Sequence, residues 1–477
     1  MTFGLEKNMP KKYHINAKVM PLNLESVHKF TIERGENCIN CGRCTKVCIY
    51  EAHKRGKGDP RKMADPNTAV CRNCFRCIQE CPRGALEKSI DKDFLNIGGA
   101  YWKADMFITL WKQAEDGKVP VSGAGYRGPF TGQGFDSMWT DMSEIVRPTR
   151  DGIHGREYIS TSVELGRKLN HLTFDENGKL LSKIHATVDI PIPIIFDVPM
   201  ENLSANVLLA QVRAAAELET CIVLPANHIP ADAKKYSRSI IPLITAKEID
   251  KHQALIKNAR IVALEYTEDL LNTFPALKDK IKKINNVLTI IRVSATKSVE
   301  NIVSRLAQNG AEIIHVVADY RGMEFNGSVN ENRRLSKDVI RAVHLKLVED
   351  RIRDEVTIIF SGGIAMAEHV PKAMICGADL VAVDVPLLIA VGARLYEEPE
   401  KIIVLPEGLE KIPVRTLMQR VINLMGAWHS QLLEVMGAMG IREARRLRGE
   451  TGRAIFFEEI DNETFGKIFK QREDRNV

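Results

Sequence analysis

The sequence predicts an α/β protein with two unequal parts, a small cysteine-rich domain and a much larger closed (β/α)8 barrel. Two observations predict this fold class. Eight of the ten cysteines of the 477-residue chain stand between residues 38 and 81. From about residue 190, short apolar, β-branched runs alternate with longer stretches whose apolar residues are three and four positions apart. The expected boundaries are 28–90 for the cysteine-rich domain, 91–188 for a linker and the segment before the barrel, and 189–455 for the barrel with its C-terminal helices.

The composition is that of an ordinary soluble globular protein, with 44% apolar and 27% charged residues. The net charge of +6 is mild, and no block rich in Lys and Arg is present, so we expect no nucleic-acid binding. An acidic redox partner protein fits this charge better. The sequence has no signal-peptide pattern and no apolar run of the roughly 18 residues that cross a membrane, which favours a cytoplasmic protein.

The cysteines form two copies of one motif, C-x2-C-x2-C-x3-C. The first copy is Cys38, Cys41, Cys44 and Cys48, and the second is Cys71, Cys74, Cys77 and Cys81. Three thiolates at two-residue gaps converge on one face of an iron–sulfur cube, and in two-cluster ferredoxins the fourth cysteine of each motif binds the other cluster. The motifs therefore predict two [4Fe-4S] clusters, one held by Cys38, Cys41, Cys44 and Cys81 and the other by Cys71, Cys74, Cys77 and Cys48.

The alternative for the same cysteines is a pair of structural zinc sites, since C-x2-C pairs also bind zinc. Two complete four-cysteine motifs favour clusters. Residues 28–90 resemble a bacterial-type two-cluster ferredoxin domain, except that Cys48 is followed by Ile49 rather than proline and that the polar insertion "HKRGKGDPRKMADPN" separates the motifs. A purely structural role for this domain is a further alternative, although two full motifs exceed what a structural role needs.

The segment between the two parts contains a false motif and few regular elements. Residues 123–128, "GAGYRG", match G-x-G-x-x-G but lack the preceding strand and following helix on which dinucleotide binding depends. For residues 136–168 we expect a linker with one short helix. That stretch is similar to the segment before the flavin-binding barrel of glutamate synthase-like proteins, notably the archaeal type with a ferredoxin insert.

Eight apolar runs are the expected strands of the barrel. An open doubly wound sheet is the alternative fold. Because parallel strands of a closed barrel end at one face, the residues after each run are the candidates for function. His315 lies inside a run and is expected to be a core residue. The runs are "IPIIFDV", "TCIVLPA", "SIIPLI", "RIVALEY", "VLTIIRV", "EIIHVVA", "VTIIFS" and "DLVAVD".

From about residue 136 to 455 the chain is similar to the flavin-binding domain of glutamate synthases, which reduce an iminoglutarate with electrons passed through iron–sulfur clusters to FMN. The resemblance implies that FMN lies against "DVPM", with Pro199 and Met200, and that Gly362 and Gly363 hold its phosphate by backbone amides. It also implies a cation at the end of the fifth strand, here Arg292, that stabilises a reduced flavin or a substrate carboxylate.

The sequence departs from this family at several positions. The glycine-rich loops after the fourth and sixth strands are replaced by "EYTEDLLNTFP" and "DYRGMEFNG". The family's [3Fe-4S] cluster needs three cysteines, and only Cys221 and Cys376 remain outside the two motifs. Asp384 stands where the family has a small residue facing the phosphate. Asp384 either contributes to the cofactor site or points away and caps the helix that begins at "VPLLIAVGARL".

Two functions follow from these patterns. The first is an iron–sulfur flavoprotein oxidoreductase that passes electrons through two [4Fe-4S] clusters to FMN, with reductive amination of the small-molecule substrate 2-oxoglutarate as the reaction that the resemblance implies. The second is a non-catalytic electron-relay or assembly subunit whose barrel has lost flavin and substrate binding. The missing substrate loops support the second, and both functions imply a redox partner protein or subunit.

Overall fold

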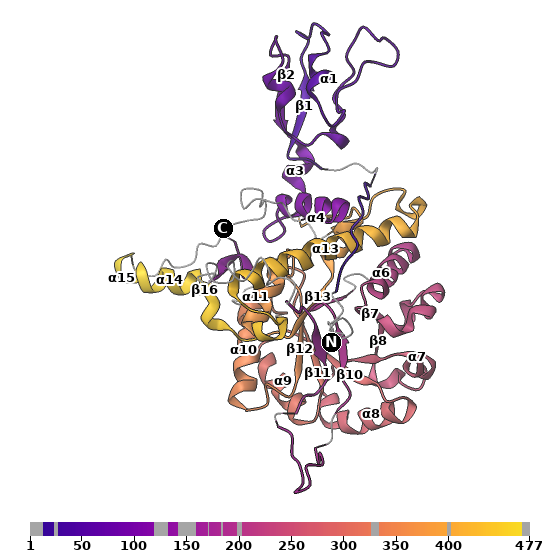
Figure 1. Ribbon diagram of the computed structural model, residues 1–477, viewed down its shortest axis with the longest axis vertical. Coiled ribbons are helices and arrows are strands. Elements are labelled where there is room, and N and C mark those ends of the chain that lie inside the picture. The colour runs from indigo at the N-terminus through magenta and orange to yellow at the C-terminus, as the bar shows by residue number, and fades with distance from the viewer. Residues whose placement is uncertain are drawn as a thin grey trace, which may run out of the picture.

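The computed structural model describes residues 13–22, 27–118, 132–141, 159–169, 171–182, 185–197, 203–325, 333–397 and 402–469. Two parts are visible in Figure 1: a small arm that carries the cysteines, drawn in indigo at the top, and a large barrel below it. The loop "GAGYRG" and the residues Pro199 and Met200 lie outside the described residues.

Eight parallel strands close into a barrel, as the sequence predicts, and each of the eight apolar runs forms one of them. The strands follow one another in chain order around the barrel, and β13 pairs with β6 to close it. The alternative of an open sheet is therefore wrong. The strands are β6 Ile194–Phe196, β7 Ile222–Pro225, β8 Ile240–Ile244, β9 Ile261–Glu265, β10 Leu288–Ser294, β11 Ile313–Val317, β12 Thr357–Ser361 and β13 Leu380–Val383.

The helices after the strands cover the outside of the barrel, which explains why the strands read as continuous apolar runs. One connection differs from the expected strand–helix alternation: β7 leads through two 3-10 helices, η6 Ala226–His228 and η7 Ala231–Ser239, to β8. The covering α-helices are α6 Ala205–Glu217, α7 Gln253–Asn258, α8 Leu270–Ile284, α9 Val299–Gln308, α10 Ser336–Glu349, α11 His369–Cys376 and α12 Val385–Ala390, with η8 Ala246–Glu248 before α7.

A long helix, α13 Val414–Met439, packs against α6 and against α4 Ala104–Asp116. Its methionines Met425, Met436 and Met439 are buried, so the methionine stripe of the sequence is core packing as expected. None of the helices in the described part of the chain is both long and apolar enough to cross a membrane.

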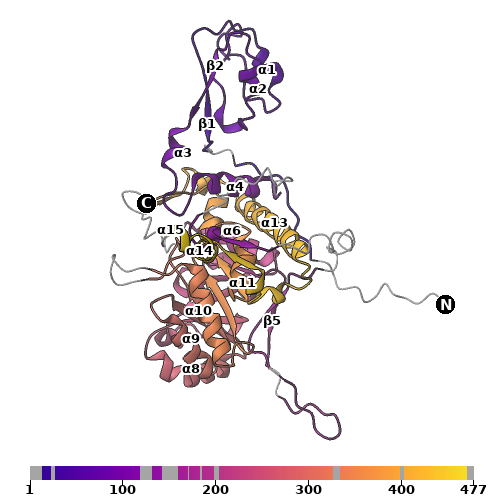
Figure 2. The same ribbon diagram turned by 90° about the vertical axis from the view of Figure 1, so that its left-hand side faces the viewer.

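The arm is built on an antiparallel pair, β1 Phe30–Arg34 and β2 Leu86–Ile90, with the short helices α1 Arg43–Val47 and α2 Arg76–Gln79 beside it. It has a core of its own, formed by Ile32, Cys44, Met63, Cys77 and Leu86. The helix α3 Lys92–Asn96 joins the arm to α4, and Figure 2 shows the arm standing away from the barrel.

The segment between arm and barrel differs from the expected linker. It contains the 13-residue helix α4, whereas the described part of 136–168 holds no α-helix but two short strands that pair with distant partners. The remaining elements are β3 Met138–Thr140 with β16 Ala454–Phe456, β4 Val163–Leu165 with β5 Val188–Ile190, β14 Arg394–Tyr396 with β15 Ile402–Val404, α14 Phe457–Thr464, α15 Gly466–Phe469, η2 Thr68–Val70, η4 Gly134–Ser137, η9 Leu409–Lys411, η10 Ala444–Leu447 and η11 Thr451–Arg453.

Candidate functional site

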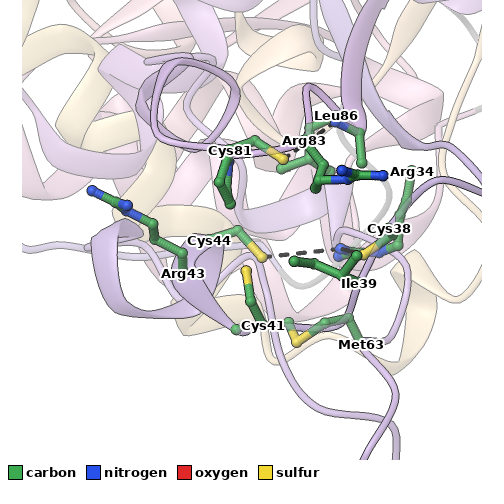
Figure 3. A pocket seen from close by; sticks show the side chains of 13 residues that line it. Arg34, Cys38, Ile39, Cys41, Arg43, Cys44, Met63, Cys81, Arg83 and Leu86 are labelled. Carbon is green, nitrogen blue, oxygen red and sulfur yellow. Dashed lines mark hydrogen bonds between the residues drawn. The ribbon is translucent and has the colours of Figure 1, made fainter.

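Four cysteines line one pocket at the far end of the arm. Cys38 and Cys41 come from the loop after β1 and Cys44 from α1, whereas Cys81 belongs to the second motif, just before β2. Figure 3 shows their sulfur atoms directed toward a common space. We call this group the outer site, because β1 runs from the barrel side of the arm at Phe30 to this end at Arg34.

The other four cysteines, Cys48, Cys71, Cys74 and Cys77, line a second pocket. This pocket lies nearer the barrel: the neighbouring Arg72 forms an ion pair of 2.6 Å with Glu115 of α4. We call it the inner site. The structure thus brings together the two cysteine sets that the sequence predicts, each with three members from one motif and the fourth from the other.

The two cysteine loops have the same local geometry because their sequences, "CINCGRC" and "CRNCFRC", repeat each other. The asparagines Asn40 and Asn73 and the residues Gly42 and Phe75 all have a left-handed backbone. That conformation costs a phenylalanine about 1 kcal/mol or more relative to glycine, so the loop is held by its surroundings. Phe75 packs edge-on against Phe30 with ring centroids 5.3 Å apart.

Backbone and side-chain donors face the cysteine sulfurs. The amide of Ala52 donates to Cys48 Sγ at 3.3 Å, and the amide of Ala85 donates to Cys81 Sγ at 3.2 Å. In the outer site the Arg34 guanidinium also lies 3.4 Å from Cys38 Sγ. Such donors stabilise sulfur in its negative, metal-binding form and tune the reduction potential of a cluster.

The donor set fits an iron–sulfur cluster in each site. All eight thiols are free of disulfides, and four sulfurs converge in each pocket. Burial raises the pKa of Cys77 to about 11, so a bound metal has to displace its proton. Zinc also accepts four thiolates. The exchange of the fourth cysteine between the motifs, however, is the arrangement of two-cluster ferredoxins.

The mouth of the barrel contains a second polar group, centred on Arg292 of β10. Arg292 Nη1 lies 2.7 Å from Oδ2 of Asp197, which follows β6 across the barrel. In register with Arg292 are Glu265 on β9 and His315 on β11. The predicted catalytic cation therefore lies at the expected end of the strand, but a buried carboxylate already partners it.

His315 is a core residue, as expected. It is fully buried, and its Nε2 lies 2.9 Å from Ser361 Oγ. Burial, with the nearby Arg292 charge, lowers its pKa to about 3, so the ring is neutral at physiological pH. Burial and the Asp197 charge raise the pKa of Glu265, against the opposing effect of Arg292. At the barrel mouth Arg292 is thus paired with Asp197 and His315 Nε2 with Ser361, whereas the buried Nδ1 of His315 has no hydrogen-bond partner among the described residues.

Packing alone accounts for the two glycines after β12. Gly362 and Gly363 have φ values of +99° and +69°. A Cβ on Gly362 would lie 2.6 Å from the carbonyl oxygens of Ala318 and Asp319, and one on Gly363 would lie 2.6 Å from Cα of Gly322. Larger residues are excluded whether or not a phosphate binds nearby.

Asp384 caps the helix after β13. Its Oδ1 accepts a hydrogen bond of 2.6 Å from the amide of Val385, the first residue of α12. Tyr101, fully buried, donates its hydroxyl to the carbonyl of Gly363. Burial raises the pKa of Tyr101 well above its ordinary value, and the charges of Asp136 and Asp384 add to the effect.

These residues do not fit the phosphate of FMN. A phosphate at the start of α12 would face the carboxylate of Asp384, and two like charges about 4 Å apart repel by about 1 kcal/mol in water and about 4 kcal/mol near a protein surface. Next to it, Tyr101 already contacts the glycine pair, and Trp102 Nε1 donates to the carbonyl of Tyr320 at 3.0 Å. The segment after the arm is thus bound beside the glycine pair, through the carbonyl of Gly363 and not through the amides that would hold a phosphate.

Sequence analysis did not find the buried contacts between the segment before the barrel and α11. The amide of Ala365 donates to His369 Nδ1 at 3.1 Å, and His369 Nε2 lies 3.0 Å from Asp136 Oδ1. Lys372 Nζ donates to the carbonyl of Phe135 at 2.8 Å. Glu368 brings a third potential metal ligand close to Asp136 and His369, but both ring nitrogens are already used, so the group is a structural clamp. No local pattern connects residues 233 positions apart.

Fold and sites together define an α/β barrel protein that carries an arm with two four-cysteine sites. Residues 232–442 match the family model described as a conserved region in glutamate synthase. The chain is a distant homologue of archaeal-type glutamate synthases over nearly its whole length, and the barrel accords with that relationship.

Individual relatives are similar at low identity. The archaeal glutamate synthase [NADPH] of Archaeoglobus fulgidus is 23% identical over 92% of this chain and 96% of its own length. The protein of the same description from Methanocaldococcus jannaschii is 25% identical over 89% and 94%. Among solved structures, a mandelate oxidase variant with benzaldehyde has 13% identity and a TM-score of 0.39, covering 65% of this chain and 98% of its own.

Proposed function

We propose that this chain is an iron–sulfur electron-transfer subunit of an oxidoreductase related to glutamate synthase, with a [4Fe-4S] cluster in each four-cysteine site. The observation that carries the proposal is the convergence of Cys38, Cys41, Cys44 and Cys81 in one pocket and of Cys48, Cys71, Cys74 and Cys77 in the other. Bound clusters supply one-electron transfer.

The protein's own residues hold and tune these groups. The amides of Ala52 and Ala85 and the guanidinium of Arg34 donate toward sulfur, which favours added negative charge and so raises the reduction potential. The Arg72–Glu115 pair connects the inner site to α4, which packs on α12 and α13 next to the barrel. In this proposal electrons therefore pass from the outer site to the inner site and on toward the barrel.

The relay function is favoured over a complete flavoenzyme by the residues at the expected phosphate position. Asp384 places a carboxylate at the start of α12, and Tyr101 is bonded to Gly363. Arg292, the expected catalytic cation, is paired with Asp197. In this proposal the barrel is a docking body for the arm and for a partner that carries out the substrate chemistry.

Metal and flavin analysis of protein purified without oxygen tests the proposal. We expect about eight irons and eight sulfides per chain and no stoichiometric flavin. A chain that contains only zinc would overturn the iron–sulfur assignment. One FMN per chain would instead support the second candidate.

The second candidate is an FMN-dependent oxidoreductase that carries out the reductive amination of 2-oxoglutarate. It is favoured by the distant homology to glutamate synthases. The left-handed glycine pair after β12 is compatible with it, although packing alone accounts for that pair. It requires that Asp384 and Tyr101 move away from the phosphate position. Equilibrium dialysis against FMN and riboflavin distinguishes the two candidates, because a phosphate site binds FMN more tightly than riboflavin, whereas a site closed by Asp384 does not.

A further inference from the structure

The tip of the arm is a basic, partly apolar surface around the outer site. We call the exposed residues Ile39, Arg43, Arg55, Arg61, Lys62 and Arg83 the tip surface. Ile39 keeps 58% of its surface exposed, and it lines the outer pocket together with Arg43 and Arg83 (Figure 3). An exposed apolar side chain beside a cysteine site and within a ring of cations is typical of a protein-docking patch.

The insertion between the two cysteine motifs provides most of this charge. Residues 53–67 contain five Lys or Arg residues and two Asp residues, a net charge of +3. One of the two acids, Asp59, is used within the insertion, where its Oδ1 accepts from the amide of Arg61 at 3.0 Å. The cations therefore outnumber the acids at this surface.

The insertion is held against the outer site. Arg55 Nη1 donates to the carbonyl of Asn40 at 3.0 Å, and the amide of Met63 donates to Asn40 Oδ1 at 2.9 Å. Met63 is buried in the core of the arm, and Arg34 Nη2 donates to the carbonyl of Ala64 at 3.0 Å. These contacts fix the charges beside Cys38 and Cys41.

Several of these cations are not placed to neutralise the cysteine site. Lys57, Arg61 and Lys62 are exposed, and none of the three is among the residues that line the outer pocket. Arg43, by contrast, lines the pocket and is partly neutralised by Glu80 at 3.0 Å. The outward-facing cations are therefore available to an external partner.

We propose that the tip surface docks an acidic iron–sulfur electron carrier, which donates electrons at the outer site; this inference rests on the proposed function. At each encounter one electron leaves the reduced centre of the carrier and is taken up at the outer site, so the carrier is oxidised by one electron and the arm is reduced by one. The inner site, tied to α4 by Arg72 and Glu115, is on the side away from the carrier. Opposite charges steer such short-lived complexes and raise their association rates.

Charge reversal at the tip tests the docking surface. The variant is Arg61→Glu with Lys62→Glu, since the hydrogen bonds described for these residues use only backbone atoms. The matched control is Lys247→Glu with Lys283→Glu, which reverses the same charge at exposed positions on the barrel. Iron content is measured first for every protein. The probe for docking is a purified acidic [2Fe–2S] ferredoxin.

Two readouts are expected to respond to the tip variant alone. Calorimetric binding of the probe at low ionic strength should weaken about tenfold or more, and stopped-flow reduction of the arm by the reduced probe should slow by a similar factor. Both effects should shrink as salt is added, because salt screens exposed charges. The control should match the wild type in both measurements.

The possible results separate the two proposals. Full iron content with equal binding by the tip variant and the control would overturn the docking surface and leave the iron–sulfur assignment standing. A shifted midpoint potential with unchanged probe binding would also overturn it, since the cations would then serve the cluster. Absence of iron in the wild type would overturn the proposed function itself, whatever the binding result.

Discussion

At the scale of single residues, the carboxylate of Asp384 connects β13 to α12. Its hydrogen bond with the amide of Val385 satisfies a donor at the start of a helix whose residues are all buried. Water cannot easily replace the carboxylate at a buried helix start, because an unpaired buried amide costs about 1 to 3 kcal/mol. The cap is thus a structural reason for an aspartate at this position.

Replacement of Asp384 should therefore affect stability according to hydrogen-bonding capacity. We expect Asp384→Ala to lower the free energy of unfolding by about 1 kcal/mol and Asp384→Asn, which keeps an acceptor oxygen, to lower it by less. Urea unfolding followed by tryptophan fluorescence measures both. Equal losses in the two variants would show that the charge, and not the cap, is what matters.

Arg292 and Asp197 form an ion pair that is largely shielded from water. Removal of one member leaves the other as an uncompensated buried charge, which typically costs about 3 to 5 kcal/mol. We expect Arg292→Met to destabilise the protein by about 3 kcal/mol and the double variant with Asp197→Leu to recover much of that loss. A double-mutant cycle in urea measures the coupling.

The same cycle distinguishes a structural from a catalytic Arg292. An Arg292→Met protein within about 1 kcal/mol of the wild type would contradict the structural role, because a buried pair cannot lose one charge at so small a cost. The cation would then be free to act on a ligand, as the resemblance to glutamate synthases implies.

At the scale of elements, the loops after β1 and before β2 exchange their fourth cysteines. We expect Cys41→Ser and Cys81→Ser to change the potential and the EPR signal of one centre, and Cys74→Ser and Cys48→Ser to change those of the other. Cys376→Ser is the control, since Cys376 is buried in α11 outside both sites. If Cys81→Ser instead altered the same centre as Cys74→Ser, each cluster would be bound by the four cysteines of one motif, and this arrangement would be contradicted.

Elements with a strong local pattern could be predicted from the sequence. All eight barrel strands are continuous apolar runs, and α6, α9 and α10 have apolar residues at helical spacing. The helix α4 was missed although it has the same signal, with Met106, Phe107, Leu110 and Ala114 on its buried side. The linker expected over residues 91–188 takes no account of this spacing.

The candidate site could be predicted only where ligands are close together in the sequence. Each cysteine set needs one long-range pairing, which the ferredoxin pattern supplies. In contrast, the contact of Tyr101 with Gly363 joins residues 262 positions apart, and the pair of Arg292 with Asp197 crosses the barrel. Nothing in local spacing specifies such contacts, because they depend on how the barrel closes.

At the scale of the whole molecule, the barrel contains histidines that stay neutral because they are buried. Burial lowers the pKa of His315 to about 3 and the pKa of His344 and of His429 to about 4. For His315 and His344 the charge of a neighbouring arginine adds to the effect. In the unfolded chain a histidine has a pKa of about 6.5.

Stability should therefore decrease as the pH falls below about 6.5, because the unfolded chain then binds protons that the folded barrel does not. Each histidine contributes a slope of at most about 1.4 kcal/mol per pH unit. The effect is absent above the unfolded pKa and grows until the pH reaches the folded pKa values. Carboxylates whose pKa is lowered by folding, such as Asp379 beside Arg353, add to the loss only below about pH 4.

Tryptophan fluorescence monitors unfolding of the barrel part and not of the arm, because all four tryptophans lie outside the arm. They are Trp102, Trp111, Trp139 and Trp428. We expect the free energy of urea unfolding to be nearly constant from pH 8 to 7 and to fall steeply between about pH 6.5 and 5. His344→Gln should reduce the number of protons taken up on unfolding by up to one, and so make the decrease of stability with falling pH less steep. The glutamine is chosen because its side-chain oxygen can still accept the hydrogen bond that Arg353 Nε donates to His344 Nδ1 at 3.1 Å. A wild-type stability that does not change between pH 7 and 5, or an His344→Gln protein with the same slope as the wild type, would show that these histidines already bind protons in the folded barrel.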